Sequence, residues 1–199
     1  MELLAYYGLL LGSTWASGIN LYLTMAGLGL AHRMAWIALP GELEVLADPI
    51  VIAAALILYI IEFVADKVPY VDSAWDAVHT AIRPIGGAAL AYLAAADANA
   101  FAQTATAIMG GAVALDAHMM KASSRVAINA SPEPFSNTAA SLAEDACVLG
   151  SIWLIIKHPV VIAVLVILFF GLSIWLLPKL FRFFKKIFIF LFKRKAAQL

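Results

Sequence analysis

Long apolar segments separated by short polar stretches dominate the chain. The clearest covers residues 159–177, which carry no charge, and a second covers residues 50–65, which are charged only at Glu62. A membrane-spanning helix needs about 20 mostly apolar residues. Four further apolar segments, which are more polar or less regular than these two, lie at residues 3–31, 84–96, 101–120 and 139–156. The pattern predicts an all-α integral membrane protein with about six transmembrane helices.

The first of these segments, residues 3–31, is long for one crossing and is polar in its middle. Glycine gives the backbone conformational freedom there, and an asparagine amide can both donate and accept hydrogen bonds. Broken helices inside a membrane are tolerated where protein or water lines their free backbone groups. We therefore expect a broken or re-entrant helix, with a simple kink as the alternative. The residues concerned are Ser13, Thr14, Ser17, Gly18 and Asn20.

The predicted spans form one transmembrane domain over residues 1–178, which divides into possible halves at residues 1–98 and 99–178. A three-helix unit that is duplicated must be inverted in the membrane. A few identities fit such a repeat, and an inverted three-helix repeat is therefore a hypothesis. These identities pair Gly12, Ala16 and Asp48 with Gly110, Ala114 and Asp145.

Residues 179–199 form a basic, aromatic tail. Phe181, Phe184, Phe188 and Leu191 recur at helical spacing, which favours an amphipathic helix lying at the lipid surface. Cytoplasmic loops carry an excess of Lys and Arg. Placing the tail in the cytoplasm leaves only Arg33 and Lys157 on or toward the other side, so both termini are predicted to be cytoplasmic.

The composition supports a membrane protein and excludes a cytosolic enzyme domain, a disordered tail and a nucleic-acid binder. Hydrophobic residues make up 64% of the 199 residues and charged residues 13%, against about 45–50% and about 25% in soluble domains. The mean hydropathy is +0.93. The formal net charge is zero, which gives no basic bias toward nucleic acid. Cys147 is the single cysteine, so the chain has no internal disulfide and no zinc-type cysteine spacing.

Ionisable side chains within membrane segments are costly and tend to be functional. A first cluster begins with Glu62 and Asp66, which are four residues apart and share a helix face. Pro69 is expected to end that helix, and Asp72 or Ser73 to cap the next one. The second helix then carries one polar stripe of Asp72, Asp76, His79 and Arg83.

This cluster has two interpretations. Its carboxylates and imidazole could bind a divalent cation, with Asp72, Asp76 and His79 as tentative metal ligands, or they could relay protons. They could equally form a structural salt-bridge network with Lys67 and Arg83 at the cytoplasmic surface.

A second cluster starts with Asp116, Lys121 and Arg125 and continues into the fifth predicted span. Ser131 followed by Pro132 is typical of a helix start, where exposed backbone amides attract anions. The alternative is an ordinary cytoplasmic loop followed by a capped helix. The polar residues that continue along the new helix are Glu133, Asn137, Ser141, Glu144 and Asp145.

Three groups of residues carry a resemblance to a known family. They are Ala16-Ser17-Gly18-x-Asn20; Glu62-Phe63-x-Ala65-Asp66-Lys67-x-Pro69-x-x-Asp72-Ser73-x-Trp75-Asp76-x-x-His79-Thr80-x-Ile82-Arg83-Pro84; and Ser131-Pro132-Glu133-Pro134-x-Ser136-Asn137 with Glu144-Asp145. From about Gly12 to about Val164 the chain resembles a bacterial membrane family catalogued as domain of unknown function 4126. The resemblance implies a multi-pass protein of the bacterial inner membrane, and the family name carries no biochemical activity.

These features favour a small secondary transporter or permease, proton- or cation-linked, that moves a small polar or anionic solute. The alternatives are a metal-dependent intramembrane lipid enzyme and a lipid or polyprenyl-phosphate translocator. The substrate-binding candidates are Asn20, Lys121, Arg125, Ser131, Glu133 and Asn137. The ion or proton candidates are Glu62, Asp66, Asp72, Asp76, His79, Asp116, Glu144 and Asp145.

The expected partners are membrane lipids and a small solute or ion, with no nucleic acid. No cofactor is certain, although a divalent cation could bind. Because six short helices enclose little room, a homodimer is plausible.

Overall fold

The regular structure of the described residues is entirely helical, which confirms the all-α fold class. The computed structural model describes residues 3–68, 70–129 and 134–196. The helices are α1 (Leu3–Ile19), α2 (Leu21–Arg33), the short 3-10 helix η1 (Gly41–Ala47), α3 (Pro49–Ala65), α4 (Val71–Ala94), α5 (Ala100–Asn129), α6 (Pro134–Lys157) and α7 (Pro159–Ala196).

The first apolar segment is broken, as its polar middle predicted. Helix α1 ends at Ile19 and α2 begins at Leu21, with Asn20 between them in an extended conformation. The Asn20 side chain accepts a hydrogen bond from the backbone N–H of Leu23 at 3.0 Å. This bond caps the new helix, because it satisfies one of the free donors of its first turn.

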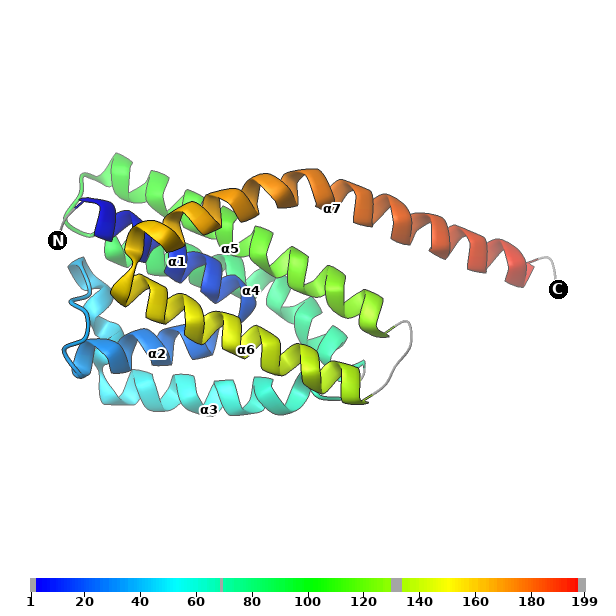
Figure 1. The fold of residues 1–199 in the computed structure, drawn as a ribbon, viewed down its shortest axis with the longest axis horizontal. Coiled ribbons are helices and arrows are strands. Elements are labelled where there is room, and N and C mark those ends of the chain that lie inside the picture. The colour runs from blue at the N-terminus through cyan, green and yellow to red at the C-terminus, as the bar shows by residue number, and fades with distance from the viewer. Residues whose placement is uncertain (1–2, 69, 130–133, 197–199) are drawn as a thin grey trace.

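The two short helices form a helical hairpin. In Figure 1, α1 runs into the bundle from the N-terminal end and α2 returns toward that end. Ala5 of α1 and Ile37, which follows α2, line one pocket together with Pro159, so both outer ends of the hairpin lie at the same end of the bundle. At about 1.5 Å per residue, each helix is shorter than the bilayer core of about 30 Å. Neither helix alone is therefore long enough for one full crossing.

Helices α3 to α7 run back and forth along the bundle (Figure 1). The most extensive helix–helix contact is between α4 and α5, where glycines allow the backbones to meet. A Cβ atom added at Gly87 would lie 2.4 Å from the Ala114 Cβ, and one added at Gly110 would lie 2.4 Å from the Ala91 Cβ. Small residues at such positions are typical of tightly packed membrane helices.

Two helices are long and apolar enough to cross a membrane, over Phe135–Lys157 and Pro159–Phe183. A third crossing is added if η1 and α3, which meet at an angle of 68°, are counted together. The predicted number of six is therefore not confirmed. Helices α4 and α5 are not among these candidates, and both carry charged side chains, including Arg83 and Lys121.

The two ends of the described chain lie at opposite ends of the bundle, because the hairpin returns the chain to its starting end (Figure 1). The side of the membrane that each terminus faces stays a prediction. Helix α5 is continuous through Gly110, so the segment that the repeat hypothesis matched to the first half contains no second break.

Helix α7 continues through Pro178 without interruption, and it extends beyond the rest of the bundle (Figure 1). The predicted tail of residues 179–199 therefore begins as part of α7 rather than as a separate helix. Its position at the lipid surface stays a prediction.

The start of α4 differs from the expected cap. Tyr70, with a positive φ of 69°, precedes the first helical residue Val71 and makes no side-chain capping bond. Asp72 lies inside the first turn and accepts a hydrogen bond from the backbone N–H of Ser73 at 2.7 Å. Other predicted helix-boundary residues, Pro69, Ser131, Pro132 and Glu133, lie outside the described residues.

Candidate functional site

Four helices bring seven charged side chains together inside the bundle, and we call this group the charge network. The side chains are three cations and four carboxylates joined by ion pairs of 2.6–4.0 Å. Six of the side chains are at most 5% exposed, and that of Glu144 is 16% exposed. The members are Glu62 of α3, Asp66 directly after it, Asp76 and Arg83 of α4, Lys121 and Arg125 of α5, and Glu144 of α6.

Lys121 lies at the centre of the charge network. Its Nζ is 2.9 Å from Asp66 Oδ2, 3.3 Å from Glu144 Oε2 and 3.5 Å from Glu62 Oε1. The fourth carboxylate, Asp76, is 4.0 Å away. One ammonium group therefore contacts carboxylates from three other parts of the bundle.

The two arginines lie on either side of Lys121 in the charge network, and each binds a carboxylate. The Arg83 Nη2 donates to Glu62 Oε1 at 2.7 Å. The Arg125 guanidinium binds Glu144 in a bidentate manner, with Nε donating to Oε1 at 3.0 Å and Nη2 to Oε2 at 2.6 Å. Paired bonds of this kind fix the orientation of both planar groups.

The break between α1 and α2 faces the charge network. The carbonyl of Gly18 accepts from Arg83 Nη1, and that of Ile19 accepts from Lys121 Nζ, each at 3.3 Å. The last carbonyls of a helix lack partners within it and carry partial negative charge. Two buried cations therefore satisfy the end of α1 inside the bundle.

Asp76 is the least satisfied carboxylate of the four. It is 3% exposed, and neither of its oxygens makes a hydrogen bond to another described residue. Its nearest cation is Arg83, whose Nη1 lies 3.4 Å from Oδ1. The other three carboxylates each accept at least one hydrogen bond from a cation.

Two histidines border the charge network in defined tautomers. Arg83 Nη1 lies 2.7 Å from His118 Nδ1. Because arginine only donates, that nitrogen accepts, and the proton of neutral His118 is on Nε2, which faces Thr80 at 3.0 Å. His79 Nδ1 donates to the Trp75 carbonyl at 2.8 Å, so its Nε2 accepts from the Tyr22 hydroxyl at 3.2 Å.

Sequence reasoning did not include His118 or Arg83 among the ion or substrate candidates. His118, Lys121 and Arg125 follow a spacing of three and four residues, and that shared helix face was the signal available for His118. Arg83 was seen as the last member of the polar stripe, but only as a partner in a surface network. The structure places it fully buried.

A second polar group lies between the start of α4 and the end of α5. Asn129 Nδ2 is 2.9 Å from both oxygens of Asp72, and its Oδ1 accepts from Asn137 Nδ2 at 2.9 Å. The Asn137 carbonyl in turn accepts from Arg125 Nη1 at 3.2 Å. Two predicted site residues, Asp72 and Asn137, are thus linked to the edge of the charge network.

The remaining candidates are placed differently. Asp145 accepts from Asn20 Nδ2 at 3.2 Å and from the Tyr59 hydroxyl at 3.0 Å, which ties it to the helix break. Asp116 lies apart, between α5 and α7, with its carboxylate oxygens 2.6 and 2.7 Å from Ser173 Oγ. Ser131, at the helix start predicted to attract anions, and the substrate-binding candidate Glu133 lie outside the described residues.

The tentative metal ligands have other partners. Asp72 is bonded to Asn129, Asp76 lies beside Arg83, and the His79 nitrogens are occupied by Trp75 and Tyr22. Among the residues that the structure describes, no three His, Cys, Asp or Glu side chains meet in a group that could hold a metal ion. The geometry therefore does not support the metal set expected from the stripe.

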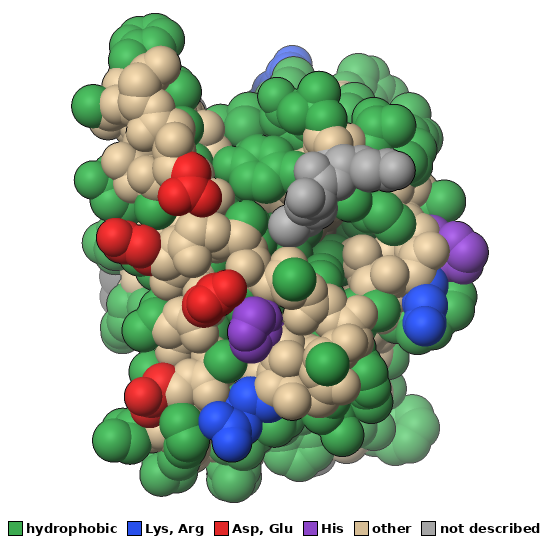
Figure 2. All heavy atoms as spheres, turned by 90° about the vertical axis from the view of Figure 1, so that its left-hand side faces the viewer, with side chains coloured by type: hydrophobic (Ala, Val, Ile, Leu, Met, Phe, Trp, Pro, Cys, Tyr) green, Lys and Arg blue, Asp and Glu red, His purple; other side chains and the backbone are tan. Residues whose placement is uncertain are grey.

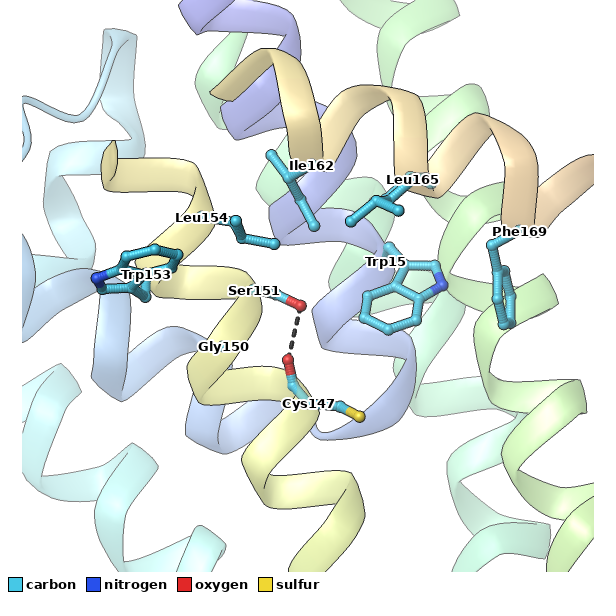
Figure 3. Close-up of a pocket in the computed structure, with 10 residues that line it drawn as sticks. Trp15, Cys147, Gly150, Ser151, Trp153, Leu154, Ile162, Leu165 and Phe169 are labelled. Carbon is cyan, nitrogen blue, oxygen red and sulfur yellow. Dashed lines mark hydrogen bonds between the residues drawn. The ribbon is translucent and has the colours of Figure 1, made fainter. Parts of the chain in front are cut away.

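A small cavity reaches the charge network between α4 and α5. Its volume is about 150 Å³, and its lining includes Asp76 and Arg125 with Ser73 and Thr80. A larger groove of about 520 Å³ lies between α6 and α7 over Trp15 (Figure 3). That groove is lined almost entirely by apolar side chains and contains no member of the charge network. Because the smaller cavity is lined by members of the charge network, it is the candidate binding site.

Comparison with known proteins adds a family but no activity. No curated protein and no solved structure matches the chain. One family model matches residues 8–179, which include the helix break, the polar stripe and every member of the charge network. The chain therefore belongs to the family described as Domain of unknown function (DUF4126).

Proposed function

We propose that this protein is a small ion-linked secondary transporter of the bacterial inner membrane, which moves a small polar or anionic solute. The observation that carries the proposal is the position of the charge network at the tip of the α1–α2 hairpin. In many transporters, broken helices meet the substrate or coupling ion near the membrane midplane. Here the free carbonyls of Gly18 and Ile19 meet the buried cations Arg83 and Lys121.

A purely structural role is the competing explanation for these charges. Buried ion pairs are weak sources of stability, because removing charges from water offsets most of their attraction. Seven charges, six of them buried, in a chain with 64% hydrophobic residues are more than packing needs. A site that must receive and release charged species supplies a reason for retaining them.

The proposed arrangement in the membrane has five crossings, α3 to α7, and one re-entrant hairpin, α1–α2. The C-terminal tail is cytoplasmic because of its many Lys and Arg residues. The opposite end of the bundle, shown in Figure 2, exposes side chains of both signs. Its exposed basic residues include Arg33 and Lys157, and its exposed acidic residues Glu42, Glu44, Asp48 and Asp97. An outer face is expected to carry fewer Lys and Arg residues than the cytoplasmic one.

The cavity between α4 and α5 is the proposed point of entry to the charge network. Arg125 lines it, and an anionic part of the solute can bind its guanidinium by exchanging with Glu144 or Asp66, which hold it in this structure. Lys121, which touches four carboxylates, links that solute position to the acidic side chains. Membrane lipids surround the bundle in this proposal, and a homodimer is compatible with it.

A lipid or polyprenyl-phosphate translocator is the second candidate. The groove over Trp15 favours it, because an apolar groove of about 520 Å³ (Figure 3) can hold an acyl or isoprenoid chain. The absence of charged residues from its lining places it second.

The test uses purified protein in liposomes on a solid-supported membrane. Rapid addition of inorganic phosphate, small carboxylates or amino acids should produce a transient current for at least one solute. Lys121→Met should abolish that current, whereas Lys157→Met, which removes an exposed lysine outside the charge network, should preserve it. If no solute of this panel produces a current and a labelled phospholipid moves across the bilayer, the lipid or polyprenyl-phosphate translocator is favoured instead.

A further inference from the structure

We propose that the coupling ion is a proton and that Asp76 is the side chain that carries it. This inference rests on the proposed transport function and identifies its ion. It starts from the charge network, where three cations face four carboxylates. With all seven groups ionised, one negative charge is left over.

The hydrogen bonds place that surplus on Asp76. Glu62, Asp66 and Glu144 are each bonded to a cation at 2.9 Å or less, whereas neither oxygen of Asp76 is hydrogen-bonded within the part of the chain that the structure describes. A buried ionised carboxylate without hydrogen bonds is very costly in a medium of low polarity. Binding one proton removes the surplus charge and leaves the other three pairs intact.

The cavity supplies a route for the proton. Asp76 lines it beside the hydroxyls of Ser73 and Thr80, and Thr80 itself donates to the Asp76 carbonyl at 2.9 Å. The volume of about 150 Å³ exceeds the roughly 30 Å³ that a water molecule occupies in the liquid. Water in this polar space can bring protons to the carboxyl group.

A metal cation fits the same space poorly. Calcium takes six to eight oxygen ligands and magnesium needs a near-octahedral set, but among the described residues that line this cavity Asp76 is the single carboxylate. Arg125 also lines it, and its permanent positive charge repels a second cation. A proton needs one oxygen only, so the site favours a proton over a metal ion.

The charged and titratable groups around Asp76 come from every neighbouring helix. Arg83, Lys121 and Arg125 favour its ionised form, whereas nearby carboxylates favour its protonated form. When a solute anion binds Arg125, the anion adds one more negative charge beside Asp76. Solute and proton therefore bind together in this arrangement. The neighbours are Asp72, His79 and Arg83 on α4, Glu62 and Asp66 at the end of α3, His118, Lys121 and Arg125 on α5, and Glu144 on α6.

The test reads the protonation of Asp76 without requiring transport. Infrared spectra of the protein in lipid nanodiscs should contain the C=O stretching band of a protonated carboxyl group at neutral pH. Asp76→Asn should remove one such band. The matched variant Asp97→Asn, at an exposed aspartate near the other end of α4, should leave the spectrum unchanged. Adding sodium or magnesium ions should not alter the Asp76 band.

Two results would overturn the inference. One is a wild-type spectrum without a protonated carboxyl band, and the other is an Asp76 band that disappears on adding sodium or magnesium. If Asp76→Asn does not fold, Asp76→Glu should shift the band instead. Solute currents without an Asp76 band would refute the proton but retain transport. A band without any solute current would retain the protonated Asp76 and refute transport.

Discussion

Asn20 and Asp145 are 125 positions apart in the sequence, and the Asn20 amide donates to the Asp145 carboxylate at 3.2 Å. The same Asn20 side chain caps α2 through the N–H of Leu23. One residue therefore both starts the returning helix of the hairpin and attaches the hairpin tip to α6. Any movement of the hairpin relative to α6 must break or remake this bond.

Replacing Asn20 should separate its two roles. Asn20→Ala removes the cap, which costs about 1 kcal/mol, and the bond to a carboxylate, which costs about 1.5–3 kcal/mol. Asn20→Ser keeps a capping oxygen and loses only the bond to Asp145. Thermal unfolding in one detergent should therefore rank wild type above Asn20→Ser and Asn20→Ala last. Equal stability of the two variants would argue against the capping role.

The bidentate pair between Arg125 and Glu144 should show strong coupling. Arg125→Met leaves Glu144 and Asp66 without one of their partners, and breaking a buried ion pair in this way costs about 3–5 kcal/mol. Adding Glu144→Gln should recover part of that loss. A double-mutant cycle should give a coupling energy of about 0.5–3 kcal/mol. Purely additive effects would contradict the pairing of these two groups.

The faces of the helices could be predicted from the sequence. The spacing of Asp72, Asp76, His79 and Arg83 placed them in one stripe, and all four are buried. The polar middle of residues 3–31 likewise predicted the break that the structure has at Asn20. Both are local properties, because helical periodicity and backbone capping depend on nearby residues.

The partners of those faces could not be predicted in the same way. Glu62 pairs with Arg83, 21 residues later, and with Lys121, 59 residues later. Helical spacing says which side chains share a face, but the opposing face is chosen by tertiary packing. The direction of α2 after the break could not be predicted from the sequence either. An extended residue at Asn20 permits either a continued crossing or a return.

Gly18 should tolerate no side chain, because α1 and α5 are in contact there. A Cβ atom at Gly18 would lie 2.3 Å from the Ala114 carbonyl oxygen and 2.7 Å from the Ala117 Cβ. Overpacking of this kind costs about 1–3 kcal/mol, so Gly18→Ala should lower the unfolding temperature and disturb the nearby Arg83 bond. Gly150 is the matched control, since a Cβ there meets nothing within 4 Å. Gly150→Ala should be neutral or stabilising by about 0.5–1 kcal/mol, and equal losses in both variants would contradict the close contact.

The proposed re-entrant hairpin places the N-terminal end of the chain on the outer side of the membrane. In a background of Cys147→Ser, which removes the single cysteine, we place one cysteine at Leu3→Cys or at Lys186→Cys. Both positions are exposed, and they lie on opposite sides of the membrane if α1–α2 returns to its starting face. A membrane-impermeant maleimide should label Leu3→Cys on intact spheroplasts and Lys186→Cys only after lysis. If both cysteines require lysis, residues 3–31 cross the membrane once, and the charge network then lies beside a continuous span rather than at the tip of a hairpin.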